Sequence, residues 1–138
     1  MKKMNIIMVY DQEEKKLLMC LRSKEPYKGL YNLVGGKVEE GEDNIESAYR
    51  ELKEETGISK DDINLTHLMD MDYYLLENSL QIYVGKLNKG VILEEEVNKL
   101  YWISLEEDFF DLTKYAGEGN IGHMVEQVQK HREVCFKK

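Results

Sequence analysis

The chain has 138 residues, of which 42% are hydrophobic and 33% charged, and its formal net charge is -8 at pH 7. We expect one domain over residues 1–138, because this length suits a single core and one proline leaves no Pro-rich linker. The negative charge would repel a phosphate backbone, which excludes a nucleic-acid polymer as partner. The apolar run at residues 4–10 is too short to span a membrane. A small molecule is therefore the expected ligand of a monomer or homodimer.

The first half of the chain predicts a strand-rich start. Alternating apolar residues predict strands at residues 5–10 and 16–22, with a polar turn between them. After a loop, residues 31–34 predict a short strand that runs into Gly35 and Gly36. Glycines at this point allow the backbone to turn sharply and to approach another group closely.

The next segment carries the clearest helix signal. Asp43 is a good N-cap with Glu46 three residues later, which is the capping-box spacing, and Gly57 supplies a C-terminal stop. Five residues at helical spacing should face the sheet. They are Ile45, Ala48, Tyr49, Leu52 and Thr56.

The rest of the chain alternates between strands and helices. Further strands are predicted at residues 63–76, 80–87 and 100–103, a last helix at residues 121–131 and a closing strand at residues 134–136. Ser104 and Glu107 repeat the capping spacing, which predicts a short helix after the third of these strands. This order of elements is typical of an α/β fold with a mixed sheet between helical layers.

Cysteine and histidine give little sign of a functional site. Cys20 and Cys135 each lie in an apolar run, which favours buried thiols over a disulfide and therefore a cytosolic location. The three histidines, His67, His123 and His131, have no metal-ligand spacing, and we interpret them as structural.

Acidic side chains crowd one side of the central helix. Glu51, Glu54 and Glu55 stand at i, i+3 and i+4, so all three carboxylates project from the same side. Such crowding is tolerable around a hard cation, and Mg2+ or Mn2+ takes oxygen ligands of this kind. The alternative is a solvated charged face on which Arg50 and Lys53 serve as surface partners.

A longer motif decides between these alternatives. From Gly36 to Ile58 the sequence GKVEEGEDNIESAYRELKEETGI fits the pattern G-x5-E-x7-R-E-U-x-E-E-x-G-U, where U is aliphatic, at every specified position. This segment resembles the signature of the Nudix hydrolases. The resemblance implies the Nudix fold, an α/β/α sandwich, and hydrolysis of a nucleoside diphosphate linked to another moiety with Mg2+ or Mn2+ as cofactor.

The resemblance also assigns roles to residues. It makes the Gly36 carbonyl and Glu55 metal ligands, Glu54 a direct or water-bridged ligand, and Glu51 either a ligand or the base that activates water. Glu42 and Arg50 would be structural, with the guanidinium fork holding acidic side chains in place. A further metal ligand is expected from the acids at residues 94–96 that precede Trp102, and we favour Glu96.

Two short segments indicate a substrate class. Residues 31–38, YNLVGGKV, lack the Pro-Gly-Gly of most family members and resemble the oxidised purine nucleoside triphosphate hydrolases, in which the asparagine, here Asn32, contacts the base. Tyr115 and Glu118 lie where those enzymes place an aromatic and an acid for stacking and hydrogen bonding, although Asp is more usual there. Arg22 could approach the phosphates.

Each of these assignments has a local alternative. Asn32 could cap nearby backbone, the segment YAGEGN could be only a Gly-rich loop, and Arg22 could lie on the surface, as we expect for Lys24. The sequence thus predicts an 8-oxo-dGTP diphosphatase that releases the monophosphate and pyrophosphate. Other nucleoside triphosphates, ADP-ribose and nucleotide sugars are alternative substrates. A non-catalytic nucleotide sensor is the alternative function, and the intact acidic motif argues against it.

Overall fold

The computed structural model describes residues 2–136 and confirms the predicted hairpin at its start. Strands β1 (Lys2–Tyr10) and β2 (Lys16–Leu21) are antiparallel, but they pair only beside the turn, at Tyr10 and Leu17. Farther along, β3 (Tyr31–Asn32) pairs with β2 and β4 (Val34–Lys37) pairs with β1. The segment from β3 to β4 therefore lies between the two strands of the hairpin.

The predicted single strand at residues 31–34 is in fact two short strands. The break falls at Leu33, whose backbone N–H donates to Oδ1 of Asn32 at 2.8 Å. The Leu33 side chain is buried, so the break is held by packing as well as by this local hydrogen bond. As a result, Asn32 pairs with β2, whereas Gly35 and Gly36 pair with β1.

Within residues 2–136, the strands form one seven-stranded mixed sheet. The later strands are β5 (Thr66–Tyr73), β6 (Asn78–Lys86) and β7 (Lys99–Ser104). The β1–β6 pair is parallel, while β5 pairs antiparallel with β6 and β7 pairs antiparallel with β2. The long strand predicted from residue 63 is shorter in the structure, and a single turn of 3-10 helix (Tyr74–Leu76) ends it.

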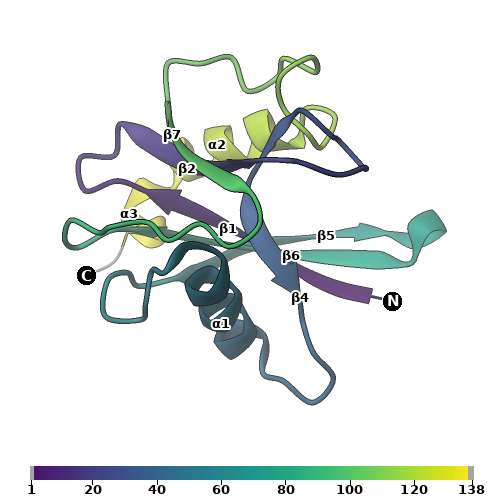
Figure 1. Ribbon diagram of the computed structural model, residues 1–138, viewed down its shortest axis with the longest axis horizontal. Coiled ribbons are helices and arrows are strands. Elements are labelled where there is room, and N and C mark those ends of the chain that lie inside the picture. The colour runs from purple at the N-terminus through teal and green to yellow at the C-terminus, as the bar shows by residue number, and fades with distance from the viewer. Residues whose placement is uncertain (1, 137–138) are drawn as a thin grey trace.

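Helices cover both faces of the sheet, as predicted. Helix α1 (Asn44–Thr56) lies against one face, and α2 (Asn120–Lys130) and α3 (Arg132–Cys135) lie against the other (Figure 1). Residues of β1 alternate between the two cores: Ile7 and Val9 pack on the α1 side, Met8 and Tyr10 on the α2 side. This alternation follows from the two-residue period of a strand.

Three local predictions are wrong. The capping box at the start of α1 does not form: Asp43 makes no side-chain hydrogen bond to the helix, and Glu46 pairs with Lys60. The short helix predicted after Ser104 is a series of turns, in which Ser104 Oγ accepts from the Glu106 N–H at 3.2 Å. The predicted closing strand is helix α3, which buries Cys135 in the core on the α2 side.

Both cysteines are free and buried, as predicted. Burial raises the pKa of the Cys20 thiol to about 11, and it also raises the pKa of Cys135. Along residues 2–136, no helix combines the length and the apolar composition that a membrane crossing requires.

Candidate active site

Helix α1 presents its acidic side chains from a well-anchored scaffold. Ala48, Leu52 and Thr56 are fully buried against the sheet, and the Thr56 hydroxyl donates to the Leu52 carbonyl at 2.6 Å. Gly57 ends the helix at φ 82° and donates its N–H to the Lys53 carbonyl at 2.9 Å, as predicted for a C-terminal stop. Because one side is fixed in the core, the acids must project from the rest of the helix.

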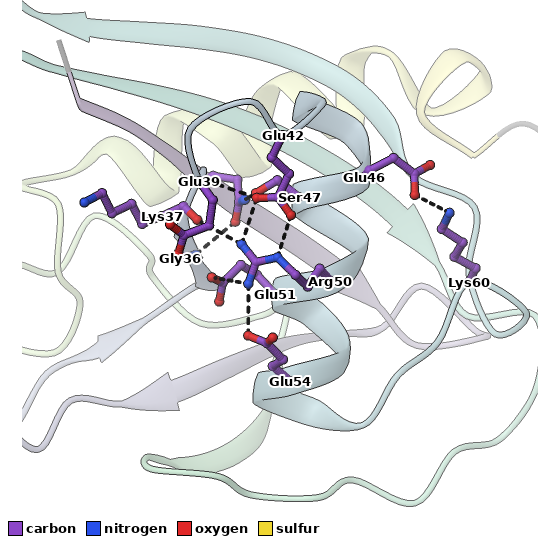
Figure 2. Close-up of polar contacts among 11 residues, drawn as sticks. Gly36, Lys37, Glu39, Glu42, Glu46, Ser47, Arg50, Glu51, Glu54 and Lys60 are labelled. Carbon is purple, nitrogen blue, oxygen red and sulfur yellow. Dashed lines mark hydrogen bonds and ion pairs between the residues drawn. The ribbon is translucent and has the colours of Figure 1, made fainter.

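Arg50 is the hub of the acidic cluster (Figure 2). Its Nη1 donates to Glu51 and to Glu54, at 3.1 Å in each case, and its Nη2 donates to Glu42 at 2.9 Å and to the Lys37 carbonyl at 3.3 Å. The hydrogen bonds from Arg50 hold the pKa of Glu42 at about 2, and those with Glu42 raise the pKa of the guanidinium itself. The guanidinium thus fixes the loop before α1 to the acids on α1.

The two glycines lie where a side chain would not fit. A Cβ at Gly35, whose φ is 150°, would lie 2.1 Å from the Asn5 carbonyl oxygen, and a Cβ at Gly36 would lie 2.3 Å from the Glu51 carboxylate. The absence of both side chains lets β4 run close to β1 and to the acidic face of α1.

Glu55 is tied to this glycine segment. Its Oε2 accepts a hydrogen bond from the Gly35 N–H at 3.0 Å. The pKa of the Glu55 carboxyl is raised to about 7, mainly by burial and also by the charges of Glu51 and Glu96, while the Gly35 N–H and Arg22 oppose the shift. Burial also raises the pKa of Glu51, against the opposing effect of Arg50. Desolvated acids so close together favour a bound cation, which would stabilise their charged forms.

Of the acids at residues 94–96, Glu96 is the one whose charge bears on Glu55. The other two are engaged elsewhere: Glu95 accepts a hydrogen bond from the Leu100 N–H at 2.8 Å, and Glu94 packs against Gly57 at the end of α1. Arg22 also bears on Glu55, while its Nε donates to the Pro26 carbonyl at 3.3 Å.

The acidic side chains offer oxygen atoms of the type that binds a divalent cation, but they are not arranged as a ready metal site. Among the described residues, no three His, Cys, Asp or Glu side chains form a ready metal-binding group. Arg50 draws Glu51 and Glu54 toward itself, and the Gly35 N–H holds Glu55. The available donors are all oxygens, which Mg2+ and Mn2+ prefer, and Gly36 leaves the carboxylate of Glu51 unobstructed by a side chain.

The two segments proposed to bind a base do lie side by side. Tyr31 and Tyr115 form a parallel β-bridge, with the Tyr31 N–H donating to the Lys114 carbonyl at 2.8 Å and the Ala116 N–H donating to the Tyr31 carbonyl at 2.9 Å. This bridge brings the loop of Glu118 next to the strand of Asn32. Segments some eighty residues apart in the sequence thus meet in the fold.

Of the side chains on these segments, Tyr115 does not lie as the sequence predicts. Tyr115 is only 3% exposed, its ring packs against Phe109 and its hydroxyl donates to Glu107 at 2.9 Å. A ring enclosed in this way has no face free for a base, so the structure does not support the predicted stacking. Asn32 uses its Oδ1 for the local hydrogen bond to Leu33, the alternative stated from the sequence, which leaves the Nδ2 donor.

Sequence reasoning missed a contact at Glu118. The Tyr27 hydroxyl donates to Glu118 Oε1 at 3.0 Å, which links the loop after β2 to the loop before α2. Both residues have positive φ, 67° for Tyr27 and 54° for Glu118. Only the Pro26-Tyr27 pair hinted at a structured loop, and nothing in the sequence pairs it with a residue ninety-one positions away.

Comparisons with known proteins identify the family and the fold of the chain. The model of the NUDIX domain family matches residues 1–121. An Ap4A hydrolase of C. elegans, solved as a binary complex, has a similar fold, with a TM-score of 0.76 and 22% identity over 96% of this chain and 98% of that one. The NUDIX domain of Shewanella oneidensis NrtR, complexed with ADP ribose, also has a similar fold. Its TM-score is 0.71, and the identity is 17% over 94% of this chain and 87% of that one.

A sequence relative matches over a shorter stretch. An ADP-ribose pyrophosphatase of Methanocaldococcus jannaschii is 45% identical over 47 residues, which are 34% of this chain and 28% of that protein. The chain therefore matches under a third of that relative's length. The family model, by contrast, covers the sheet, α1 and the start of α2. The chain belongs to the NUDIX domain family.

Proposed function

We propose that the protein is a Nudix hydrolase that uses Mg2+ or Mn2+ to cleave a phosphoanhydride bond in a nucleoside diphosphate derivative. The observation that carries this proposal is an acidic cluster beside the Gly35–Gly36 backbone, in which Arg50 holds Glu51 and Glu54 and the Gly35 N–H holds Glu55. A lone binding module has no need of so many crowded carboxylates. The proposed metal-binding residues are Gly36, Glu51, Glu54, Glu55 and Glu96.

The proposed reaction is the attack of water on one phosphorus, with cleavage of the bridging P–O bond. When bound, the cation would neutralise phosphate charge and lower the pKa of water. The Glu51 carboxylate either binds the cation or accepts the proton of the attacking water, and its raised pKa suits the second role. Arg50 positions Glu51 and Glu54, and Arg22 is proposed to contact substrate phosphate.

We propose a purine nucleotide as substrate. Asn32 and Glu118, on two segments that meet at the Tyr31–Tyr115 bridge, favour an oxidised purine triphosphate such as 8-oxo-dGTP. Glu118 would accept from the donors on the guanine edge and Asn32 would donate from Nδ2. Monophosphate and pyrophosphate would be the products.

ADP-ribose is the second candidate substrate. It is favoured by the name of the archaeal relative and by the ligand of the Shewanella structure. The Ap4A hydrolase of C. elegans adds a dinucleoside polyphosphate to the same chemical class. All three candidates join a purine nucleoside to a phosphoanhydride, so the proposed metal chemistry is the same for each.

The proposals for domain number, oligomeric state, partners and location rest on the sequence. We propose that residues 1–138 form one domain that acts as a monomer or homodimer without a nucleic-acid polymer as partner. A cytosolic location is proposed from the two free, buried thiols.

A turnover screen tests this function. Oxidised and normal dNTPs, ADP-ribose, Ap4A and nucleotide sugars are incubated with the protein in EDTA, and then with excess Mg2+ or Mn2+. Hydrolysis of a purine substrate that requires the added cation is the expected result. Full activity in EDTA would overturn the metal assignment. Tight nucleotide binding without turnover of any substrate would instead favour a sensor.

A further inference from the structure

Two buried polar side chains join β1 to α1 beneath the acidic cluster. Asn5 is 1% exposed and Ser47 is completely buried, and Nδ2 of Asn5 donates to the Ser47 hydroxyl at 3.1 Å. Neither residue is specified by the sequence motif. Buried polar groups persist when they are fully hydrogen-bonded, and they then fix the relative position of the elements that carry them.

The other end of the Asn5 amide holds the glycine segment. Its Oδ1 accepts a hydrogen bond from the Gly36 N–H at 2.9 Å. A backbone N–H can only donate, so this contact fixes the orientation of the amide and directs its NH2 group toward Ser47. Asn5 therefore binds both β4 and α1 through one rigid side chain.

The position of Asn5 in the sheet makes this double contact possible. Asp70, Gln81, Asn5 and Gly36 stand in one row across β5, β6, β1 and β4. Since cross-strand neighbours share a face, Asn5 and Gly36 both face α1. Asn5 is thus the side chain that lies between the glycine of the motif and the helix of the motif.

Ser47 extends the connection to the acids. It precedes Arg50 by three residues and Glu51 by four, so it lies on the same side of α1 as these residues. Its hydroxyl accepts from Asn5 and can donate its own proton, and it helps to lower the pKa of Glu42, the partner of Arg50. The chain of hydrogen bonds runs from Gly36 through Asn5 to Ser47, which lies one helical turn from Arg50 and Glu51 on α1.

We propose that Asn5 is a positioning residue that sets the distance between the Gly36 backbone and the Glu51 carboxylate, and that Ser47 is its partner. The inference rests on the proposed metal-dependent function, because a cation that takes ligands from both β4 and α1 requires this distance to be fixed. A Cβ on Gly36 would already lie 2.3 Å from Glu51, so a small movement of either element changes the site.

The test removes the hydrogen bonds while keeping the volume. Asn5→Leu replaces the amide with an apolar group of similar shape, and Ser47→Ala removes only the hydroxyl at a helical position. Val128→Ala is the matched control, because Val128 is equally buried but lies in the core on the opposite face of the sheet. Three quantities are measured in each variant: Mn2+ affinity by EPR, exchange of the Gly36 amide by NMR without metal, and kcat/KM.

Asn5→Leu is expected to weaken Mn2+ binding by about 10- to 100-fold, as is usual when a residue that orients metal ligands is lost. Exchange of the Gly36 amide should be about tenfold faster or more, since its acceptor is gone. Ser47→Ala should show smaller effects in the same direction and stands in for Asn5→Leu if that variant does not fold. Val128→Ala should lose thermal stability but keep Mn2+ affinity.

Two results would overturn the proposal: parental Mn2+ affinity and Gly36 exchange in the folded variants, or an equal loss of affinity in Val128→Ala. Failure of the proposed function looks different. A parent that hydrolyses no nucleotide, but whose Mn2+ affinity and Gly36 exchange depend on Asn5, would refute the enzymatic proposal and support the positioning role. A parent that hydrolyses nucleotides, but whose Mn2+ affinity and Gly36 exchange do not depend on Asn5, would support the enzymatic proposal and refute the positioning role.

Discussion

The backbone N–H of Gly35 donates to the carboxylate of Glu55, twenty residues later, at 3.0 Å. This contact joins β4 to the last turn of α1. The Gly35 N–H can therefore still donate to any side chain at position 55 that carries a hydrogen-bond acceptor. The carboxylate charge, by contrast, is needed only if a cation binds there.

This relationship makes Glu55→Gln the sharpest test of the metal assignment. The glutamine keeps the volume and can still accept from Gly35, but it removes the charge. We expect kcat to fall by about 10^2- to 10^3-fold or more, as for loss of a well-placed electrostatic group, with an unchanged circular dichroism spectrum. Glu54→Gln should act in the same direction. Turnover equal to the parent in saturating Mg2+ would show that Glu55 is not a ligand.

Gly36→Ala should disturb the site through its effect on Glu51. The new methyl group would lie 2.3 Å from the Glu51 carboxylate, which must then move. We expect weaker Mn2+ binding and a lower kcat/KM. Gly90→Ala is the control, because the nearest atom to its Cβ, on Gln12, is 4.0 Å away. An equal loss in both variants would indicate a general effect on the fold.

Asn32→Ala and Glu118→Ala should mainly raise KM for a purine substrate. Each lost partner in the base site should cost about 1 to 3 kcal/mol, while hydrolysis of a pyrimidine triphosphate should hardly change. Tyr27→Phe is an informative companion, because it removes the hydroxyl that now occupies Glu118 and should not raise KM. A parent that prefers ADP-ribose to every dNTP would refute the 8-oxo-dGTP assignment and leave the metal chemistry intact.

Tyr115 should prove structural. Because the ring is buried against Phe109, Tyr115→Ala is expected to lower the free energy of unfolding by about 3 to 5 kcal/mol, measured in urea. Tyr115→Phe, which loses only the hydrogen bond to Glu107, should cost about 1 kcal/mol and keep the parental KM for purines. A selective rise in KM for Tyr115→Phe would restore its predicted role at the base.

Cys20 gives a pH dependence with a definite sign. Its thiol ionises near pH 9 in the unfolded chain, but burial raises the pKa to about 11 in the fold. Between these values the folded state binds the proton more strongly, so this thiol lowers the free energy of unfolding as pH rises, by at most about 3 kcal/mol. The stability difference between the parent and Cys20→Ala should narrow from pH 8.5 to 11. A constant difference would contradict the shifted pKa.

Local patterns predicted most of the framework because the determinants are local. The apolar period of α1, its stop at Gly57 and the alternation in β1 each depend on neighbours within a few residues, and all were confirmed. The acidic cluster followed from helical spacing in the same way. The break at Leu33 was missed because it depends on two different partner strands, which no local pattern records.

The rest of the site depends on contacts between distant segments. In the sequence, Tyr115 stands in a Gly-rich segment typical of a loop. Its burial follows from packing against Phe109 and from the bridge to Tyr31. Asn5 could have been noticed as a polar residue in an apolar strand, a position that requires a partner. The sequence gives no indication that the partners are Ser47 and Gly36.

The contacts of Arg50 have a consequence for ion selectivity. Its guanidinium lies at 3.1 Å from both Glu51 and Glu54, and therefore serves as a tethered counter-ion of single charge. An incoming ion must compete with it for the same carboxylates. Na+ or K+ would gain no more charge neutralisation than the guanidinium already provides, and would have to dehydrate as well. If the cluster binds a cation as proposed, a divalent ion gains about twice the attraction of a monovalent ion, so the proposed site is expected to favour divalent cations on charge alone.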